Sequence, residues 1–413
     1  MDRPVPTARA ERYAAFRHHA YLRFWAARLL INFATQIVSV AVGWLVYDLT
    51  RDPFKLGLVG IVQFIPSLLL FLVTGAVADR FGRRLIMGLA ALLEAACAAT
   101  LLVLTWSGAI SAPTIFLVLA VFGVARAFFS PASASLVANL VPTDDFANAI
   151  AWNSSASQVA TIAGPTAGGL LYGLSPTVAF ATAAIMMTAG GLLALSIPKP
   201  EQQSEVEKPS LEVLFAGFRY IRGEKIVLGA ISLDLFAVLL GGAIALLPVY
   251  ARDILDLGPW GLGLLRSAPG IGSLAVAVWL AGHPVRDSAG VIMFICVGLF
   301  GFFTVVFGLS TITWLSVAAL ALTGAADMIS VYVRETLIQL WTPDHLRGRV
   351  NAVNMVFIGA SNEVGEFRAG TMAALIGTVP AVVVGGVGAI AVAALWAGLF
   401  PALRKVRRLD GRI

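Results

Sequence analysis

The sequence predicts an all-α membrane protein that crosses the bilayer twelve times, as two six-helix pseudo-repeats. Its 413 residues are 59% hydrophobic and only 13% charged, whereas soluble domains have about 25% charged residues. Apolar stretches of about 20 residues recur along the whole chain, and each is long enough to cross a hydrocarbon core as a helix. The second half of the chain also repeats features of the first.

Twelve spans account for the apolar stretches. We expect them at residues 22–47, 54–78, 85–106, 112–138, 147–173, 177–197, 226–250, 259–282, 289–308, 313–340, 347–376 and 380–402. Four aromatic residues fall near span ends, where tryptophan and tyrosine commonly lie at the membrane interface. They are Trp44, Tyr47, Trp106 and Trp314.

The chain divides into an N-terminal half at 1–197, a cytoplasmic linker at 198–225 and a C-terminal half at 226–413. The linker opens with the polar stretch "PKPEQQSEVEKPS". It continues as "LEVLFAGFRYIRGEK", whose apolar residues share one helix face, so we expect a helix lying in the cytoplasmic interface.

The two halves repeat each other weakly. The segment "LVANLVPTDDFANAIAWN" joins spans four and five, and "LIQLWTPDHLRGRVNAVN" joins spans ten and eleven, so Pro142 aligns with Pro343 and Asn153 with Asn354. Parallel six-helix repeats are how one class of secondary transporters is built, with the substrate site near the bilayer midplane between the repeats. The repeat therefore predicts transport.

The net charge of +6 indicates topology rather than a nucleic-acid partner. Lysine and arginine concentrate in the N-terminal arm, in loop 79–84, in residues 199–225 and after residue 402, whereas the opposite loops hold only Arg51, Lys55 and Arg252. By the positive-inside rule both termini are cytoplasmic. We expect a multi-pass protein of the cytoplasmic (inner) membrane.

The loop between spans two and three reads "GAVADRFGRR". This motif resembles the G-x-x-x-D-R-x-G-R-R loop of the major facilitator superfamily. The resemblance implies the major facilitator fold and a latch that closes the cytoplasmic side against the start of span eleven. The gate residues would be Gly75, Asp79, Arg80, Gly82, Arg83 and Arg84. Static anchoring of topology by the arginines is compatible with this role.

Two further features lie in the first half. Span five contains "GPTAGG", with Gly164, Pro165, Gly168 and Gly169, which resembles the helix kink of antiporters in the superfamily, although an ordinary packing kink has the same pattern. Span four carries Arg126 inside an apolar run. Exporters of the superfamily often have an arginine there that takes part in proton coupling, and a structural ion pair is the alternative.

Charged residues inside the second half are the candidates for proton coupling or for the substrate cavity. Asp327 and Arg334 lie two turns apart on one face of span ten, and Glu363 and Glu366 share a face of span eleven, from which Arg368 points away. Span seven adds Asp234. Paired carboxyl groups in an apolar cavity can exchange a proton near neutral pH, and a nearby arginine favours the charged form. Static ion pairs with Arg126, Arg334 or Arg368 are the alternative.

Glu94 in span three is not included among these candidates. It lies in an apolar run, where it could equally belong to a proton path or face a neighbouring helix.

Together these stretches resemble the branch that contains the enterobactin exporter and related efflux permeases. The resemblance implies export of a small organic compound, siderophore-like or drug-like, by proton antiport with alternating access. The alternatives are a proton-coupled importer, a lipid permease on the same fold, and a non-transporting sensor. We expect a monomer in contact with membrane lipids, without a metal or a cofactor. No nucleotide-binding loop or nucleophile elbow is present, so an enzyme is not expected.

Overall fold

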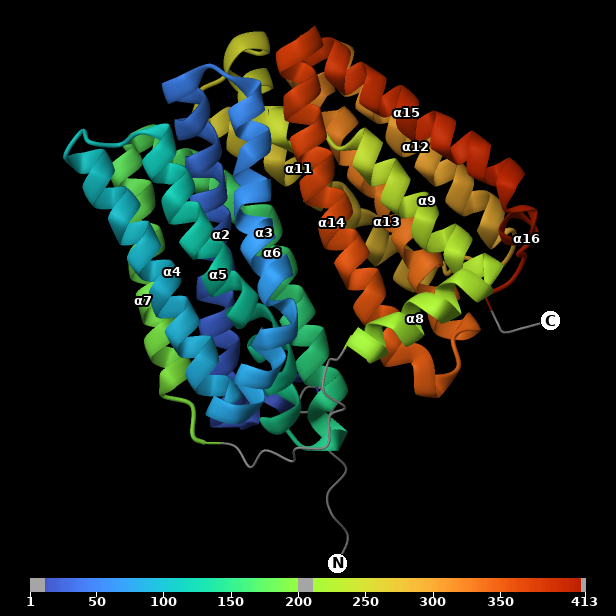
Figure 1. Cartoon of the computed structure of the whole chain (residues 1–413), viewed down its shortest axis with the longest axis horizontal. Helices are drawn as coiled ribbons and strands as arrows, with labels where there is room; N and C mark the ends of the chain where they lie inside the picture. Colours follow the sequence, from blue (N-terminus) through green and yellow to red (C-terminus); the bar gives the residue numbers. More distant parts are fainter. Residues whose placement is uncertain (1–11, 200–210, 410–413) are drawn as a thin grey trace, which may run out of the picture. The chain divides into compact units, whose positions relative to one another are not determined.

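The computed structural model describes residues 12–199 and 211–409; the side chains of residues 71, 72, 75, 76, 78, 79 and 211–215 lie outside this description (Figure 1). The contacts divide the chain into two compact units. One contains residues up to 41 and the segment from 65 to the linker, and the other contains residues 42–64 and everything after the linker. Residues 42–64, where the first two long helices meet, therefore belong to the same unit as the C-terminal part of the sequence.

The first unit is an antiparallel bundle in which α4 packs between α5 and α7 (Figure 1). Its elements are η1 (Ala14–Arg17), most of α2 (His19–Thr50), the second part of α3 (Pro53–Phe81), α4 (Arg83–Trp106), α5 (Ala112–Leu136), η2 (Val137–Asn139), α6 (Thr143–Leu174) and α7 (Pro176–Leu195). Tyr21 and Phe24 are fully buried in its core.

The second unit pairs α12 with α15 and α13, α11 with α13, and α9 with α14 and α15. Its elements are α8 (Leu211–Gly223), α9 (Lys225–Gly241), η3 (Ile244–Leu246), α10 (Leu247–Val249), η4 (Tyr250–Ile254), α11 (Pro259–Gly282), α12 (Ala289–Leu309), α13 (Thr313–Trp341), α14 (Asp344–Ile376), α15 (Thr378–Leu399) and α16 (Pro401–Arg404). The first part of α3 and the end of α2 complete it.

The predicted all-α membrane fold is confirmed. Each predicted span except the seventh corresponds to a helix over most of its length, and the described residues contain no strand. Within residues 12–199 and 211–409, ten helical segments are long and apolar enough to cross a membrane by length and composition. The other two predicted spans correspond to α6 and α14, which carry more polar and charged residues.

The seventh span differs from its prediction because it is interrupted. Residues 226–250 are expected as one helix, but α9 ends at Gly241, Gly242 is extended with ψ 125°, and short helical turns follow. Glycine is a poor helix former, and Pro248 lacks the amide hydrogen that a continuous helix would use. Interrupted backbone at membrane depth needs protein groups to satisfy its free carbonyls.

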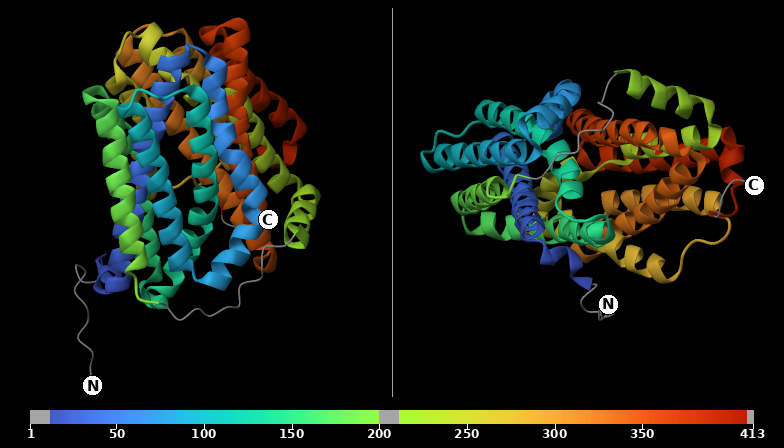
Figure 2. Two further views of the ribbon diagram at one scale, coloured as in Figure 1. Left: turned by 60° about the vertical axis from the view of Figure 1, so that its left-hand side comes forward. Right: turned by 90° about the horizontal axis from the view of Figure 1, so that it is seen from below.

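The linker prediction falls partly on residues 200–210, which lie outside the described residues. The helix expected after them is α8, which packs beside α14 at the edge of the second unit (Figure 2). Ile221 of α8 is buried in the core that contains Val227 and Leu337. Gly217 lies close to the backbone of Arg349, so a larger side chain there would collide with α14.

Candidate transport site

One group of predicted site residues meets between α9 and α13. Arg334 forms an ion pair with Asp234, and only 4% of the Arg334 side chain is exposed. Asp327 interacts electrostatically with both. Asp234 and Asp327 line one cavity of about 10 Å³, close to the smallest volume that holds a water molecule. In this structure the two aspartates therefore share one arginine.

Glu335, which was not predicted, extends this group. Its carboxylate lies 3.7 Å from Nε of Arg334 and accepts a hydrogen bond of 3.1 Å from Nδ2 of Asn354 on α14. About 40% of its side chain is exposed. The group therefore joins α9, α13 and α14 through charged and polar contacts.

The second group is built on α14. Glu363 and Glu366 are both half-buried, and Arg266 of α11 interacts electrostatically with both. The carboxylate of Glu363 also faces Gly60 of α3, where a Cβ would collide with it. Arg266 is not among the predicted residues, although it interrupts the apolar run "WGLGLLRSAPG" as Arg126 interrupts its own run. The same signal would have found it.

The first part of α3 crosses α14 at a pair of glycines. A Cβ on Gly370 would lie 2.7 Å from the Pro53 carbonyl oxygen and 2.8 Å from Cα of Gly57. Phe54 packs against Phe367, with ring centroids 5.8 Å apart. We call this contact the α3–α14 seam. It allows the two backbones to approach closely beside the Glu363 carboxylate.

Arg368 does not pair with any predicted carboxylate in the part of the chain that the structure describes. Its Nε donates to the Leu239 carbonyl at 2.8 Å, and its Nη2 donates to the Leu240 carbonyl. These carbonyls lie at the C-terminal end of α9, where the helix is interrupted. A cation there satisfies free carbonyls and complements the negative end of the helix dipole. Arg368 is thus a cap for α9.

Hydrogen bonds and ion pairs join the end of α2 to the turn after α10. Asp253 accepts a hydrogen bond from the Tyr47 hydroxyl and lies 3.2 Å from Nη1 of Arg51. Asp48 pairs with Arg252, whose guanidinium carbon lies 5.5 Å from the Trp44 ring centroid. Trp44 and Tyr47 are therefore buried in protein, at 8% and 5% exposure, and their assignment to a membrane interface belt is wrong.

Arg126 lies in the first unit, on α5. Its Nη1 is 3.8 Å from Oε1 of Glu94 on α4, and its guanidinium carbon lies 5.4 Å from the centroid of Phe129. The Glu94 side chain has no exposed area. The partner of Arg126 is thus the glutamate that the sequence left unassigned.

Most of the predicted gate motif lies at the turn between α3 and α4. Gly82 has φ 89°, in the left-handed region that favours glycine. Arg83 donates to the Asn139 side chain at 2.8 Å and to the Ser135 carbonyl, and Arg84 donates to the Ile197 carbonyl. The surroundings of Gly75 and Asp79 lie outside the described side chains. Arg80 is exposed, and the latch stays a prediction.

The glycines of the predicted helix kink bring α6 against α2. A Cβ on Gly164 would lie 2.6 Å from Cβ of Gln36, and one on Gly168 would lie 3.0 Å from Cα of Ile37. Pro165 and Gly169 are buried inside an α6 that runs unbroken from Thr143 to Leu174. This geometry accounts for the motif by packing, and its link to antiport remains a prediction.

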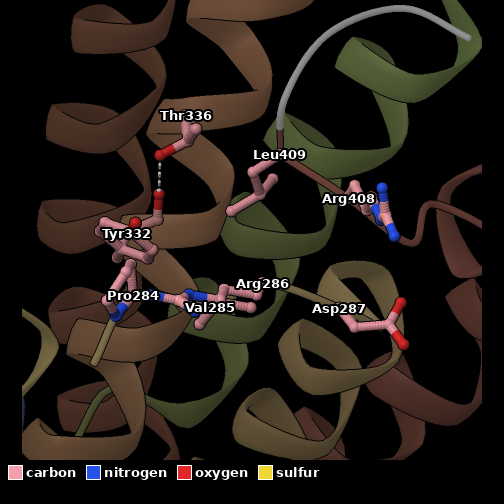
Figure 3. Close-up of a pocket in the computed structure, with 8 residues that line it drawn as sticks. All are labelled: Pro284, Val285, Arg286, Asp287, Tyr332, Thr336, Arg408 and Leu409. Carbon is pink, nitrogen blue, oxygen red and sulfur yellow. Dashed lines mark hydrogen bonds between the residues drawn. The ribbon is translucent and has the colours of Figure 1, made fainter.

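A larger pocket of about 500 Å³ lies at one end of the second unit (Figure 3). It is lined by Pro284, Val285, Arg286, Asp287, Tyr332, Thr336, Arg408 and Leu409. None of the predicted carboxylates contributes to it. In the described part of the chain no three His, Cys, Asp or Glu side chains are arranged to hold a metal ion.

The architecture and its charged groups can now be compared with known proteins. A family model described as "Transmembrane secretion effector" matches residues 10–411. The chain belongs to this family. It is a transporter of the major facilitator superfamily, a multi-pass inner-membrane protein and not an enzyme.

Curated relatives of this transporter include two enterobactin exporters named EntS. That of Citrobacter koseri is 26% identical, with 95% of this chain and 94% of the relative covered. That of Escherichia coli O127:H6 is 25% identical, with 96% and 95% covered. The likeness therefore extends over essentially the whole length of both proteins.

Solved structures show the same fold at low identity. A bacterial homologue of the human lysosomal transporter Spinster matches with a TM-score of 0.76 and 14% identity, covering 95% of this chain and 99% of the other. A bacterial homologue of the iron transporter ferroportin matches with a TM-score of 0.69 and 16% identity, covering 94% and 99%. At such identity only the fold is shared.

Proposed function

We propose that this transporter exports a small organic compound, siderophore-like or hydrophobic and drug-like, in exchange for protons by alternating access. The direction and the substrate class follow the names of its curated relatives, which are enterobactin exporters. The observation that carries proton exchange is the group formed by Glu363, Glu366 and Arg266, beside Gly60.

The charges in this group favour exchange of one proton. The positive charge of Arg266 balances the negative charge of one glutamate, so one bound proton neutralises the other glutamate. Two carboxylates so close together disfavour each other's ionisation and titrate as a pair. A buried charge without a balancing partner is costly, which makes the protonated and deprotonated groups prefer different surroundings.

The α3–α14 seam connects this proton to movement. Glu363 faces α3 at Gly60, so separation of α3 from α14 would change the surroundings of its carboxylate. A change in surroundings changes proton affinity, and by reciprocity proton binding shifts the equilibrium between the closed and the open seam. This linkage is what an exchanger driven by a proton gradient requires.

The test is export by the wild type and by a Glu363→Gln, Glu366→Gln double variant in an efflux-deficient host. Accumulation of catecholate siderophores and of hydrophobic dyes is measured with and without an uncoupler. We expect the wild type to lower accumulation of at least one compound only while the gradient is intact. The double variant should lose this effect, to the level of cells without the transporter.

Asp344→Asn is the matched control, since it removes a carboxylate from the same helix where the side chain is 89% exposed. Gradient-driven export that persists in the double variant would make these glutamates structural and move the proton site to Asp234, Asp327 or another carboxyl group. Accumulation raised by the wild type would show import, and a compound moved only between leaflets would show a lipid permease.

A further inference from the structure

The first unit encloses an acidic side chain that is not part of the proposed proton-exchange group, Glu363, Glu366 and Arg266. Glu94 has no exposed area, and its helix α4 packs on α5 and α7 and shares a buried core with Ala27 and Ile31 of α2. The sequence of α7 contains no ionisable side chain, and that of α5 contains only Arg126. On α4 itself Cys97, which is also buried, interacts with Glu94. Among the charged groups that the structure describes, Arg126 is the one that acts electrostatically on Glu94.

The distance between the two side chains is too long for a hydrogen bond. Nη1 of Arg126 and Oε1 of Glu94 are 3.8 Å apart, whereas a charge-assisted bond between such groups is about 2.7–2.9 Å long. Among the residues that the structure describes, neither carboxylate oxygen of Glu94 has a hydrogen-bond partner. Nη1 of Arg126 has none either. An ionised Glu94 would therefore be an enclosed charge without a direct contact.

Arg126 is also held on its other side. Its guanidinium lies over the Phe129 ring, and Arg28 of α2, which in turn interacts with Tyr21, acts on it as a like charge. About 30% of the Arg126 side chain is exposed, whereas Glu94 is fully enclosed. Part of the Arg126 side chain is thus accessible from outside the protein, whereas Glu94 is not.

These observations define two arrangements. We propose that Glu94 is a proton-binding site whose occupancy is controlled by Arg126. With the proton bound, Glu94 is a neutral acid and Arg126 stays at the observed distance. When Arg126 moves about 1 Å closer, it reaches charge-assisted hydrogen-bond distance. The O–H bond of Glu94 then breaks, the proton passes to water on the exposed side of Arg126, and the carboxylate pairs with the guanidinium, which keeps its own protons.

This inference rests on the proposed function only in that both take the proton as the ion coupled to transport. It adds a proton site in the unit that contains none of the carboxylates predicted for proton coupling or for the substrate cavity. Arg126 is a positioning residue in this scheme, because it acts through Glu94. A permanent ion pair, with Glu94 always charged, is the competing arrangement.

Infrared difference spectroscopy of the purified full-length protein separates the two. The carbonyl stretching band of a protonated carboxylic acid is followed as the pH is raised. We expect a band that disappears with rising pH and is missing from Glu94→Gln. In Arg126→Gln the band should persist to higher pH, because the positive charge that favours ionised Glu94 has been removed. At the same alkaline pH, the ratio of protonated to ionised Glu94 should be about tenfold or more above that of the wild type. Cys97→Ala, one turn away, should keep the wild-type profile.

Identical wild-type and Glu94→Gln spectra over the whole pH range would overturn the proposal. So would an Arg126→Gln profile equal to that of the wild type, a readout that does not require the Glu94 variant to fold. Circular dichroism and gel filtration identify a variant that is misfolded.

Export assays on the same variants keep this inference separate from the proposed function. We expect Glu94→Gln to lose export driven by the gradient while it still binds the substrate. Full gradient-driven export by Glu94→Gln would overturn its coupling role and leave the proposed function standing. A wild type that shows the titrating band but no gradient-driven export would overturn the proposed function and leave the proton site standing.

Discussion

At the scale of single residues, Arg368 shows how an intramembrane charge can serve the backbone. Its guanidinium binds the Leu239 and Leu240 carbonyls where α9 stops. A free carbonyl away from water is costly, and the arginine provides donors in a fixed planar arrangement. The charge that the sequence offered as part of a proton site is therefore accounted for by helix capping.

Replacement of Arg368 by glutamine should destabilise the protein. Each hydrogen bond to a charged group contributes about 1.5–3 kcal/mol, and the remaining carbonyls would lose their partners. We expect a lower midpoint of thermal unfolding in detergent, with Arg368→Lys in between because lysine keeps the charge but not the planar arrangement. Unchanged unfolding with lost export would instead assign Arg368 to the transport site.

At the scale of elements, the α3–α14 seam depends on the absence of side chains. The atoms that a Cβ on Gly370 would meet belong to the backbone of α3, so they cannot rotate away. The seam is therefore formed by backbone packing near the Glu363 carboxylate.

A Gly370→Val substitution should hold α3 away from α14. The accessibility of a Phe54→Cys side chain to a thiol reagent should rise, measured in a background with Cys97 and Cys296 replaced by alanine, since Phe54 packs on Phe367 in the closed seam. Gly348→Val is the control. Gly348 lies on the same helix as Gly370, but no atom would lie within 4 Å of a Cβ at that position. Equal labelling in the two variants would contradict the role of the seam.

At the scale of the whole molecule, the distribution of basic residues predicts that both termini face the cytoplasm. A C-terminal green fluorescent protein fusion should fluoresce, and a C-terminal alkaline phosphatase fusion should be inactive, because each reporter folds on one side of the membrane. A phosphatase fused after Arg51, in the first short loop, should be active. The reverse pattern would invert the topology.

The helices were predictable from the sequence, and the pairing of charges was not. Runs of about 20 apolar residues determine the spans by length alone. Which way a charged residue faces depends on how its helix packs, so Arg334 was assigned to a face but not to Asp234. The interruption of α9 was missed because glycines are common in membrane helices, and the burial of Trp44 because span ends do not reveal contacts with another loop.

The proximity of Gly60 to the Glu363 carboxylate has a consequence for sequence divergence. A side chain at position 60 would displace the carboxylate, so a change at one of these two positions alters the surroundings of the other. A transporter of this fold with alanine or serine at position 60 would be expected to carry a shorter or uncharged residue at position 363. If the proposed proton exchange holds, loss of the acid and gain of a side chain on the neighbouring helix would mark a relative that no longer uses this proton site.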